Sequence, residues 1–432
     1  MLPDGYTREG RHCAELVRSM TACGAVDAVG LNCVSAPGAM RALVQQLGET
    51  KLPLAVMPNA GYPVVTRTRV QYQGRPEYFA RELARLAAEG VRILGGCCGT
   101  TPAHIAALRA ALDALPETLP AAPAAAVSTA AKPEVEKDDA FLRKLNAGKK
   151  VIAIELDSPK DADLTGYLDG ARRLQAAGAD LLTIADCPIA RARMDSSLVA
   201  CRVHRELGLN VLPHMTCRDR NLNATKALLL GLYAEGVREV LAITGDPIPT
   251  AERDEVKNVY QFNSRKLAQY IVSLAGEGRE MPSPLTVFGA LNLNARNFDV
   301  ELRRAVEKLE NGMTGFLTQP VLSAQAVVNL KKTRETLGEK AKILAGIMPV
   351  VSQRNAIFME NEVNGIHVDA EIIERFAGLD RAQGEELGLE VSVKAAQAAA
   401  PYADGFYLMT PFNRIALMER LIARLKDEGI AD

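Results

Sequence analysis

Apolar runs alternate with longer segments of helical periodicity from about Phe141 to the C-terminus. Eight of the runs are interpreted as buried strands, at 151–157, 180–186, 211–216, 239–247, 284–292, 315–321, 342–350 and 405–411. Nearly continuous apolar strands separated by helices are typical of parallel sheets that are covered on both faces. Eight strand–helix units in succession therefore predict an α/β fold, a (β/α)8 barrel.

The helical segments between these strands have clear C-terminal signals. Three of them end at a glycine, as many helices do, namely at Gly178, Gly208 and Gly312. Between the seventh and eighth strands, residues 354–403 form a longer helical passage. We interpret this passage as an insertion on the rim of the barrel.

Residues 1–115 show the same alternation on a smaller scale. Three strands are expected at 25–33, 52–61 and 91–100, together with about four helices. Three such units leave open parallel edges and cannot close a barrel. We therefore expect this region to be the C-terminal part of a larger barrel whose front is absent from this chain.

Residues 116–140 are rich in alanine, proline and charge and lack apolar periodicity. Such a composition predicts an extended linker. The chain is therefore expected to consist of two domains, 1–115 and 141–432, joined by this segment.

Composition limits the partners of the protein. Of its 432 residues, 48% are hydrophobic and 24% charged, the profile of a globular enzyme. A formal net charge of -1 without basic blocks gives no reason to expect a nucleic-acid partner or an anionic membrane. No apolar run has membrane-spanning length and no signal pattern is present, so a cytoplasmic location is expected.

Three of the eight cysteines lie where a metal site could form. Cys33 ends one expected strand, and the adjacent pair Cys97 and Cys98 ends another, which favours reduced thiols over a disulfide framework. Three thiolates at strand ends can surround one Zn²⁺ and leave its fourth position open for a ligand. The alternative is a set of ordinary buried thiols.

The motifs around these cysteines resemble the closing third of the homocysteine S-methyltransferase family. They are GLNC at 30–33, PNAG at 58–61 and GGCCGTTPAHI at 95–105. The resemblance implies a zinc ion on Cys33, Cys97 and Cys98 that makes the homocysteine thiol a better nucleophile. It begins partway through the family, so the earlier strands of the pocket have no counterpart. Because an unclosed framework holds metal poorly, we expect weak or substoichiometric zinc and no homocysteine methylation by this chain alone.

Polar residues at the ends of three strands of the second region are candidates for catalysis. Glu155 lies between Ile154 and Leu156, and aliphatic surroundings raise the pKa of a carboxyl group so that it can act as a general acid. His214 lies in the polar end of the run 211–216, and Asp246 follows Gly245 after the fourth run. The alternatives are a salt-bridged Glu155, a hydrogen-bonded structural His214 and an Asp246 that caps a helix.

Two common nucleotide signatures are missing. No GxGxxG follows an expected strand and no GxxxxGK[ST] occurs, so neither a dinucleotide-binding fold nor a phosphate-binding loop is supported. Any nucleotide cofactor is therefore expected on the face of the barrel where the strands end.

Taken together, four motifs of the second region resemble methylenetetrahydrofolate reductase. They are IELDSP at 154–159, HMTCRDRN at 214–221, ITGDP at 243–247 and FLTQP at 316–320. The resemblance implies a TIM barrel that binds FAD at the strand ends. It also implies that NAD(P)H reduces this FAD. The hydride then passes to 5,10-methylenetetrahydrofolate and gives 5-methyltetrahydrofolate.

The same resemblance implies roles for single residues. Glu155 matches the acid that protonates the folate nitrogen, and Asp246 matches the aspartate beside flavin and pterin. Gln319 and Arg414 match residues on the folate side. Residues that match FAD contacts are His214, Thr244, Gly245, Asp246, Asn292 and Lys308.

Three positions depart from the family pattern. The acid stands in ELDSP, where the family often has an EFFPP-like run. Thr244 replaces an arginine that contacts the flavin, and Asn292 replaces an aromatic flavin contact. These differences concern how FAD is bound.

Two other functions are kept open. One is a zinc-dependent homocysteine S-methyltransferase, since a methyltransferase domain fused ahead of the reductase is a known bifunctional arrangement. The other is a non-catalytic module that binds folate or flavin. The sequence leaves open the choice between NADH and NADPH, the methyl donor, and whether the protein is a homo-oligomer.

Overall fold

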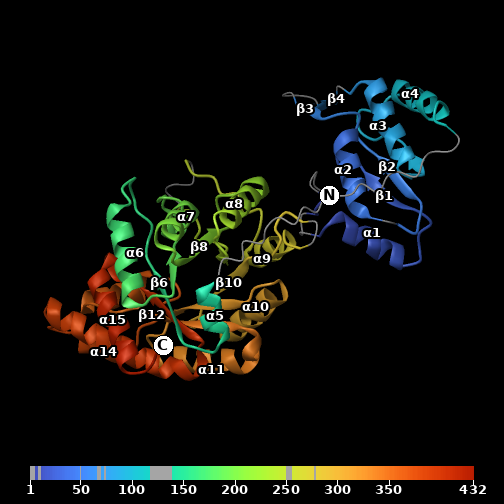
Figure 1. Cartoon of the computed structure of the whole chain (residues 1–432). Helices are drawn as coiled ribbons and strands as arrows, with labels where there is room; N and C mark the ends of the chain where they lie inside the picture. The colour runs from blue at the N-terminus through green and yellow to red at the C-terminus, as the bar shows by residue number, and fades with distance from the viewer. Residues whose placement is uncertain are drawn as a thin grey trace. The chain divides into compact units, whose positions relative to one another are not determined.

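The structure, a computed structural model, describes residues 5–7, 11–48, 50–65, 70–72, 74–116, 139–249, 255–276 and 279–432. It divides into two compact units, Met1–Glu134 and Val135–Asp432 (Figure 1). Most of the expected linker, residues 117–138, lies outside the described residues.

The second unit contains eight parallel strands that form a closed barrel (Figure 1). They follow one another around the ring in chain order, and the last strand pairs with the first. The strands are β6 (Val151–Glu155), β7 (Leu181–Ile184), β8 (Asn210–Thr216), β9 (Glu239–Ile243), β10 (Thr286–Leu291), β11 (Gly315–Pro320), β12 (Lys342–Ile347) and β13 (Gly405–Met409). The predicted (β/α)8 barrel is confirmed.

Helices connect these strands. The described helices of this unit are α5 (Ala140–Asn146), α6 (Thr165–Ala177), α7 (Ser196–Leu207), α8 (Leu222–Ala234), α9 (Ser264–Ser273), α10 (Phe298–Glu310), α11 (Ala324–Leu337), α12 (Gln353–Glu362), α13 (Ala370–Arg375), α14 (Arg381–Ala399) and α15 (Ile415–Asp427). Short 3₁₀ turns are η1 (Pro188–Ala190), η3 (Gly338–Lys340), η4 (Ala400–Tyr402) and η5 (Pro411–Asn413). The predicted helical insertion before the last strand corresponds to α12, α13 and α14.

One large side chain from every strand fills the interior of the barrel. The set is Val151, Leu181, Leu212, Leu241, Phe288, Leu317, Leu344 and Tyr407, all nearly inaccessible to solvent. Helix α5 adds Phe141 and Leu145 to the same cluster, with the Phe141 and Phe288 rings 6.3 Å apart between centroids. Burial of this apolar surface is the main driving force for closing the ring.

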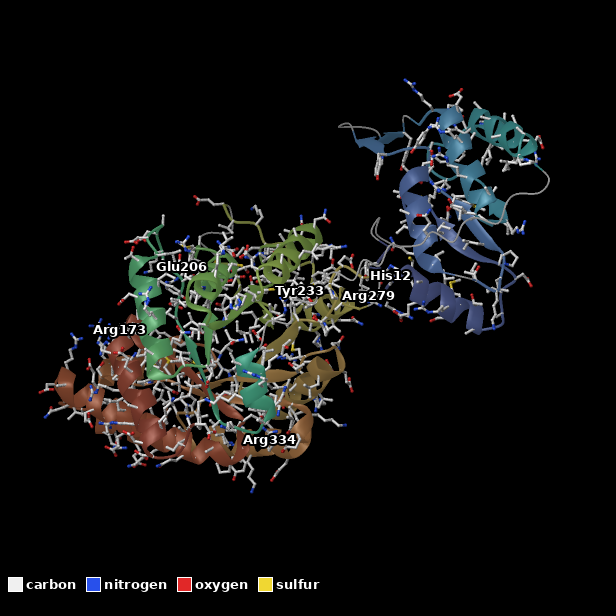
Figure 2. The ribbon with its side chains drawn as sticks, in the orientation of Figure 1. His12, Arg173, Glu206, Tyr233, Arg279 and Arg334 are labelled. Atoms are coloured by element: carbon white, nitrogen blue, oxygen red, sulfur yellow. The ribbon has the colours of Figure 1, made fainter. Side chains whose placement is uncertain are left out.

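Carboxylates fix the turns that lead into the strands. Asp404, just before β13, accepts a hydrogen bond from the backbone of Ile343 and pairs with Arg334 of α11. Figure 2 labels Arg334. Asp180, just before β7, accepts from the backbone of Ile152 at 2.8 Å and pairs with Lys144. Each carboxylate therefore links two neighbouring strands through the backbone and is neutralised by a helix cation.

The first unit contains a parallel sheet with the order β1–β2–β5. Its strands are β1 (Val29–Asn32), β2 (Leu54–Met57) and β5 (Ile93–Leu94), and its helices are α1 (Cys13–Ala22), α2 (Pro37–Leu47), α3 (Pro76–Ala88) and α4 (Pro102–Asp113). An antiparallel hairpin of β3 (Pro63–Val65) and β4 (Val70–Tyr72) was not predicted. Its two strands are three residues each, too short to give an alternating pattern.

No described helix in either unit is both long enough and apolar enough to cross a membrane.

The barrel interior can be tested with Phe288→Ala. The substitution leaves a cavity beside Phe141, and loss of a buried phenylalanine typically costs about 3–5 kcal/mol. We expect that decrease in the free energy of unfolding, measured by denaturant titration with circular dichroism. Phe358→Ala is the control, because Phe358 is 49% exposed, and it should cost less than about 0.5 kcal/mol. Equal losses in both variants would contradict the assigned core.

Candidate functional site

The carboxyl ends of the barrel strands bring most of the predicted residues to one edge of the barrel. Glu155 is the last residue of β6, and His214 lies near the end of β8. The remaining members follow or end other strands, and they are Thr244, Gly245, Asp246, Asn292, Gln319 and Arg414. In a closed parallel barrel these positions surround one mouth.

Glu155 has two close polar neighbours. The hydroxyl of Tyr407 donates a hydrogen bond to its Oε2, and Nε2 of His214 lies 3.8 Å from the same oxygen. The Glu155 side chain is 23% exposed and that of His214 only 6%. Among the described residues, His214 Nε2 has no hydrogen-bond partner. The pair therefore contains a buried ring nitrogen without a hydrogen-bond partner at the carboxyl ends of β6 and β8.

Burial disfavours the charged form of both groups. It raises the pKa of Glu155 from 4.5 to about 7, with the Tyr407 hydrogen bond opposing the rise and the charge of Asp157 adding to it. Burial also lowers the pKa of His214 to about 4, against the opposing charge of Asp186. Below about pH 7 the mouth therefore holds a protonated carboxyl group beside a neutral imidazole. A carboxyl group with a pKa near 7 is suited to general acid catalysis.

A charged network beneath the mouth fixes β8 against β7. Asp186 accepts hydrogen bonds from the backbone and the hydroxyl of Thr216, both at 3.0 Å, and pairs with Arg220 at 2.7 Å. Arg220 also pairs with Asp195, the N-cap of α7, at 2.6 Å. Burial would raise the pKa of Asp186, but Arg220 and the Thr216 bonds outweigh it and the pKa is lowered. Asp186 is thus a fixed negative charge.

Arg218 joins the loops around Asp246. Its guanidinium, 2% exposed, donates to the carbonyl oxygens of Asp246 and Cys187, each at 3.3 Å, and pairs with Asp219 at 2.8 Å. The Asp246 side chain accepts from the backbone of Ile189 at 2.9 Å. The hypothesis that Asp246 caps a helix is wrong for the residues described directly after it, because 247–249 are not helical. Asp246 instead holds the neighbouring β7–α7 loop.

Gly245 is required by the close packing of two strand ends. Its φ is +91°, and a Cβ atom there would lie 2.9 Å from the Cβ of Thr216. Any other residue would be strained and would displace β8. The exposed Thr244 and Asp246 on either side are thereby held at the mouth.

Two predicted cofactor contacts are engaged with the protein itself. Nζ of Lys308, on α10, donates to the carbonyl of Ala290 at 2.6 Å and lies 3.9 Å from Glu301. Asn292 accepts a hydrogen bond from the backbone of Asn294 at 2.9 Å. No contact described in the structure links either residue to Glu155.

Arg414 lines a cavity of about 560 Å³ on the same rim. The walls come from α12, the start of α14 and the loop after β13, and they are Val351, Ser352, Arg354, Asn355, Phe358, Leu379, Asp380, Arg381, Phe412 and Arg414. Arg414 pairs with Glu385 at 2.9 Å. The cavity combines exposed aromatic rings with three guanidinium groups, but Glu155 is not in its wall.

Sequence reasoning missed Tyr407, Asp186 and Arg218. Tyr407 is the inward-facing member of β13, so its place on the eighth strand was a usable signal. Asp186 and Arg218 lie just after β7 and β8, but their bonds join loops that are far apart in sequence. Local patterns carry no signal for such contacts.

In the first unit, three sulfur atoms converge as expected. The Sγ atoms of Cys33 and Cys98 lie 3.3 Å apart and those of Cys97 and Cys98 3.9 Å, and all three lie within 4.8 Å of one another. Asn59 accepts hydrogen bonds from the Cys33 thiol and the Cys98 backbone, and the Tyr72 hydroxyl bonds with Cys98. Tetrahedral zinc with sulfur ligands requires separations of about 3.8 Å, so the donor set fits that metal.

Comparison with known proteins identifies two families. The model of the family described as methylenetetrahydrofolate reductase matches residues 140–426, and that described as homocysteine S-methyltransferase matches residues 2–112. The chain is 44% identical over 89 residues to methionine synthase of Mycobacterium tuberculosis (strain ATCC 25618 / H37Rv), a match that covers 20% of this chain and 8% of the relative. It is 38% identical over 107 residues to homocysteine S-methyltransferase of Escherichia coli (strain K12), covering 24% and 34%. The chain thus spans a small part of these relatives.

One solved structure is similar in outline. It is described as an uncharacterized protein from Clostridium thermocellum that binds two copies of 5-methyl-5,6,7,8-tetrahydrofolic acid. The TM-score is 0.49 at 15% sequence identity, covering 67% of this chain and 98% of that chain. At this similarity nothing about ligands follows for the present chain.

The raised pKa of Glu155 predicts a pH-dependent stability. Below about pH 4.5 the carboxyl group is protonated in both the folded and the unfolded chain, and as the pH rises towards 7 only the unfolded chain releases the proton. The contribution of this group to the free energy of unfolding is therefore fully present below pH 4.5 and is lost by about pH 7. Glu155→Gln stays neutral, so the Tm of this variant relative to wild type should rise by several degrees across this window. That rise corresponds to about 2–3 kcal/mol in the free energy of unfolding.

Thermal melts at several pH values measure this difference, in which the titration of His214 cancels. Glu339→Gln is the control, because the Glu339 side chain is 88% exposed and its difference from wild type should not change with pH. A difference for Glu155→Gln that is equally flat would show that its carboxyl group has an ordinary pKa.

Proposed function

Because the family match covers residues 140–426, the chain belongs to the methylenetetrahydrofolate reductase family, and we propose that its barrel reduces methylenetetrahydrofolate with hydride from NAD(P)H by way of FAD. The observation that carries this proposal is the Glu155 carboxyl group at the mouth, which is bonded to Tyr407, lies 3.8 Å from His214 and has a pKa raised to about 7. A reduction that must also open a ring at nitrogen needs both a hydride and a proton donor.

The polar atoms of the mouth suit an organic cofactor. His214 Nε2 and the hydroxyl of Thr410 are buried without partners among the described residues, at the ends of β8 and β13. Buried polar atoms normally find a partner, so these two favour a ligand with hydrogen-bonding edges. When bound, FAD would take hydride from the nicotinamide and supply it to the folate. One edge of the bound FAD would contact the residues that follow β9, namely Thr244, Gly245 and Asp246.

Glu155 would provide the proton. With a pKa near 7, a large fraction of Glu155 is protonated at neutral pH and can give the proton to the folate nitrogen, so that the five-membered ring opens to an iminium group that accepts hydride. The neutral His214 beside it adds no positive charge that would draw the proton off. The negative charge of Asp246 would influence both half-reactions, the reduction of the flavin and the reduction of the folate. Gln319 would orient the pterin by hydrogen bonds.

The cavity beside Arg414 suits the other end of a folate. An aminobenzoyl group is aromatic and its glutamate is anionic. Phe358 and Phe412 supply apolar surface there, and Arg354, Arg381 and Arg414 supply positive charge. The cavity is therefore proposed as the site of the substrate tail.

The proposal is tested by Glu155→Gln in rapid mixing. Reduction of the flavin by NAD(P)H needs no proton from Glu155 and should stay within about twofold of wild type. Oxidation of the reduced flavin by methylenetetrahydrofolate should slow by about 10²–10⁴-fold, the usual contribution of a general acid.

Asp157→Asn is the matched comparison, because it keeps the acid and removes a nearby negative charge. It should leave most of the folate half-reaction intact while moving its pH dependence to lower values. Equal damage to both half-reactions by Glu155→Gln would show that Glu155 is structural and would overturn its proposed role.

The thiol cluster of the first unit supports a metal site. The convergence of Cys33, Cys97 and Cys98 supports zinc binding, and bound zinc would activate a homocysteine thiol. The three-stranded sheet β1–β2–β5 gives this site less support than a closed barrel would. We propose that the cluster binds zinc weakly and that this chain alone does not methylate homocysteine.

Zinc content and competition with a chromophoric chelator test the cluster. Cys98→Ser should abolish binding, since Cys98 is the thiol closest to both others. Cys23→Ser is the control, because Cys23 is exposed and its thiol bonds to the carbonyl of Met20. Equal metal loss in the two variants would contradict the assignment, and homocysteine turnover would contradict the expected inactivity.

A further inference from the structure

Tyr407 is built into the barrel interior rather than its rim. On β13 it is paired with Ala153 of β6, two residues before Glu155, and it belongs to the layer that fills the ring. The residue is 6% exposed, and its hydroxyl reaches up to Oε2 of Glu155. Tyr407 is the member of that layer that carries a hydroxyl group. A phenol in an otherwise apolar layer needs a partner for its polar end, and here the partner is Glu155.

Within the described residues, this hydroxyl is the single hydrogen-bond donor to the Glu155 carboxyl group. Burial, followed by the charge of Glu155, raises the pKa of Tyr407 well above its ordinary value, so the phenol keeps its proton. A donor to a carboxylate stabilises its charged form, and so opposes the effect of burial on Glu155.

Other ionisable groups face Glu155 from each neighbouring element. Asp157 follows β6 and pairs with Arg193 at 3.2 Å, and His214 comes from β8. Tyr167 of α6 donates its hydroxyl to the carbonyl of Leu156 at 3.2 Å, not to Glu155. Asp186, in the loop after β7, acts on His214 and is neutralised by Arg220. None of these groups donates a hydrogen bond to the acid.

We propose that Tyr407 is a positioning residue for Glu155. Its hydroxyl occupies Oε2, which leaves Oε1 as the oxygen that carries and releases the proton, and it sets the pH range over which that proton is available. The inference rests on the proposed role of Glu155 as the general acid.

Tyr407→Phe removes the hydroxyl and keeps the ring that fills the barrel. Tyr167→Phe is the matched control, since it removes a buried hydroxyl from the same end of β6 that is bonded to backbone instead. The ¹³Cδ resonance of Glu155, identified by its absence in Glu155→Gln, should titrate near pH 7 in wild type. In Tyr407→Phe the midpoint should rise by about one pH unit or more, as expected for loss of a hydrogen bond to a charged group. In Tyr167→Phe it should not move.

The folate half-reaction gives a second readout. In Tyr407→Phe, the alkaline limb of the pH–rate profile of this half-reaction should move to higher pH together with the Glu155 midpoint. Flavin reduction by NAD(P)H should keep its pH dependence. An unchanged Glu155 midpoint would overturn the role of Tyr407. A midpoint that moves while the folate reaction does not follow it would support the coupling of Tyr407 to Glu155 and overturn the role of Glu155 as acid.

One measurement does not depend on folding of a Tyr407 variant. In the wild type, one tyrosine ¹³Cζ resonance should titrate with the Glu155 midpoint, and the same resonance should stop titrating in Glu155→Gln. Absence of any tyrosine resonance that follows Glu155 would contradict the proposed contact.

Discussion

The pairing of β13 with β6 is the constraint on which the rest of this barrel depends. It joins the last strand to the first over five residue pairs, from Gly405 with Val151 to Met409 with Glu155. Closure removes both open edges of a parallel sheet, which would otherwise expose unpaired backbone groups. It also brings Tyr407 and Glu155, separated by 252 positions in the chain, into direct contact.

The same packing that stabilises the ring shifts the pKa values of Glu155 and His214. Eight apolar or aromatic side chains fill the interior below Glu155, and so few water molecules can solvate its charge. The pKa of the carboxyl group is therefore raised to about 7, and burial lowers the pKa of the His214 imidazole to about 4. Around them, Asp186, Arg218 and Arg220 are paired and hold the loops. Fixed charges thus surround two groups whose charged forms are disfavoured by burial.

The thiol site follows a different physical logic. Its three sulfur atoms are brought together by the ends of two strands, with Asn59 bonded to both sides of the cluster. The local motif was enough to predict this convergence. The contact of Tyr72 with Cys98 comes from the hairpin β3–β4, whose strands were too short to predict.

Sequence patterns predicted the barrel because a strand buried on both faces is apolar along most of its length, as in β6 up to Ile154 and in β12 after Lys342. They also predicted that Glu155 would be an unusual acid, from Ile154 and Leu156 alone. The structure adds contributions from distant parts of the chain, since the closed ring buries Glu155 and raises its pKa, whereas the hydroxyl of Tyr407 opposes that rise. Asp246 illustrates the limit of local reasoning. A capping aspartate is a local pattern, whereas its bond to the Ile189 backbone joins two loops.

The central claim is that hydride reaches a folate through a flavin held at this mouth. The most direct measurement is the absorbance of the purified full chain, reconstituted with FAD and kept anaerobic. The account predicts a flavin spectrum that bleaches when NADH or NADPH is added and returns when methylenetetrahydrofolate follows. A chain that binds no flavin, or a bleached flavin that the folate fails to reoxidise, would contradict it.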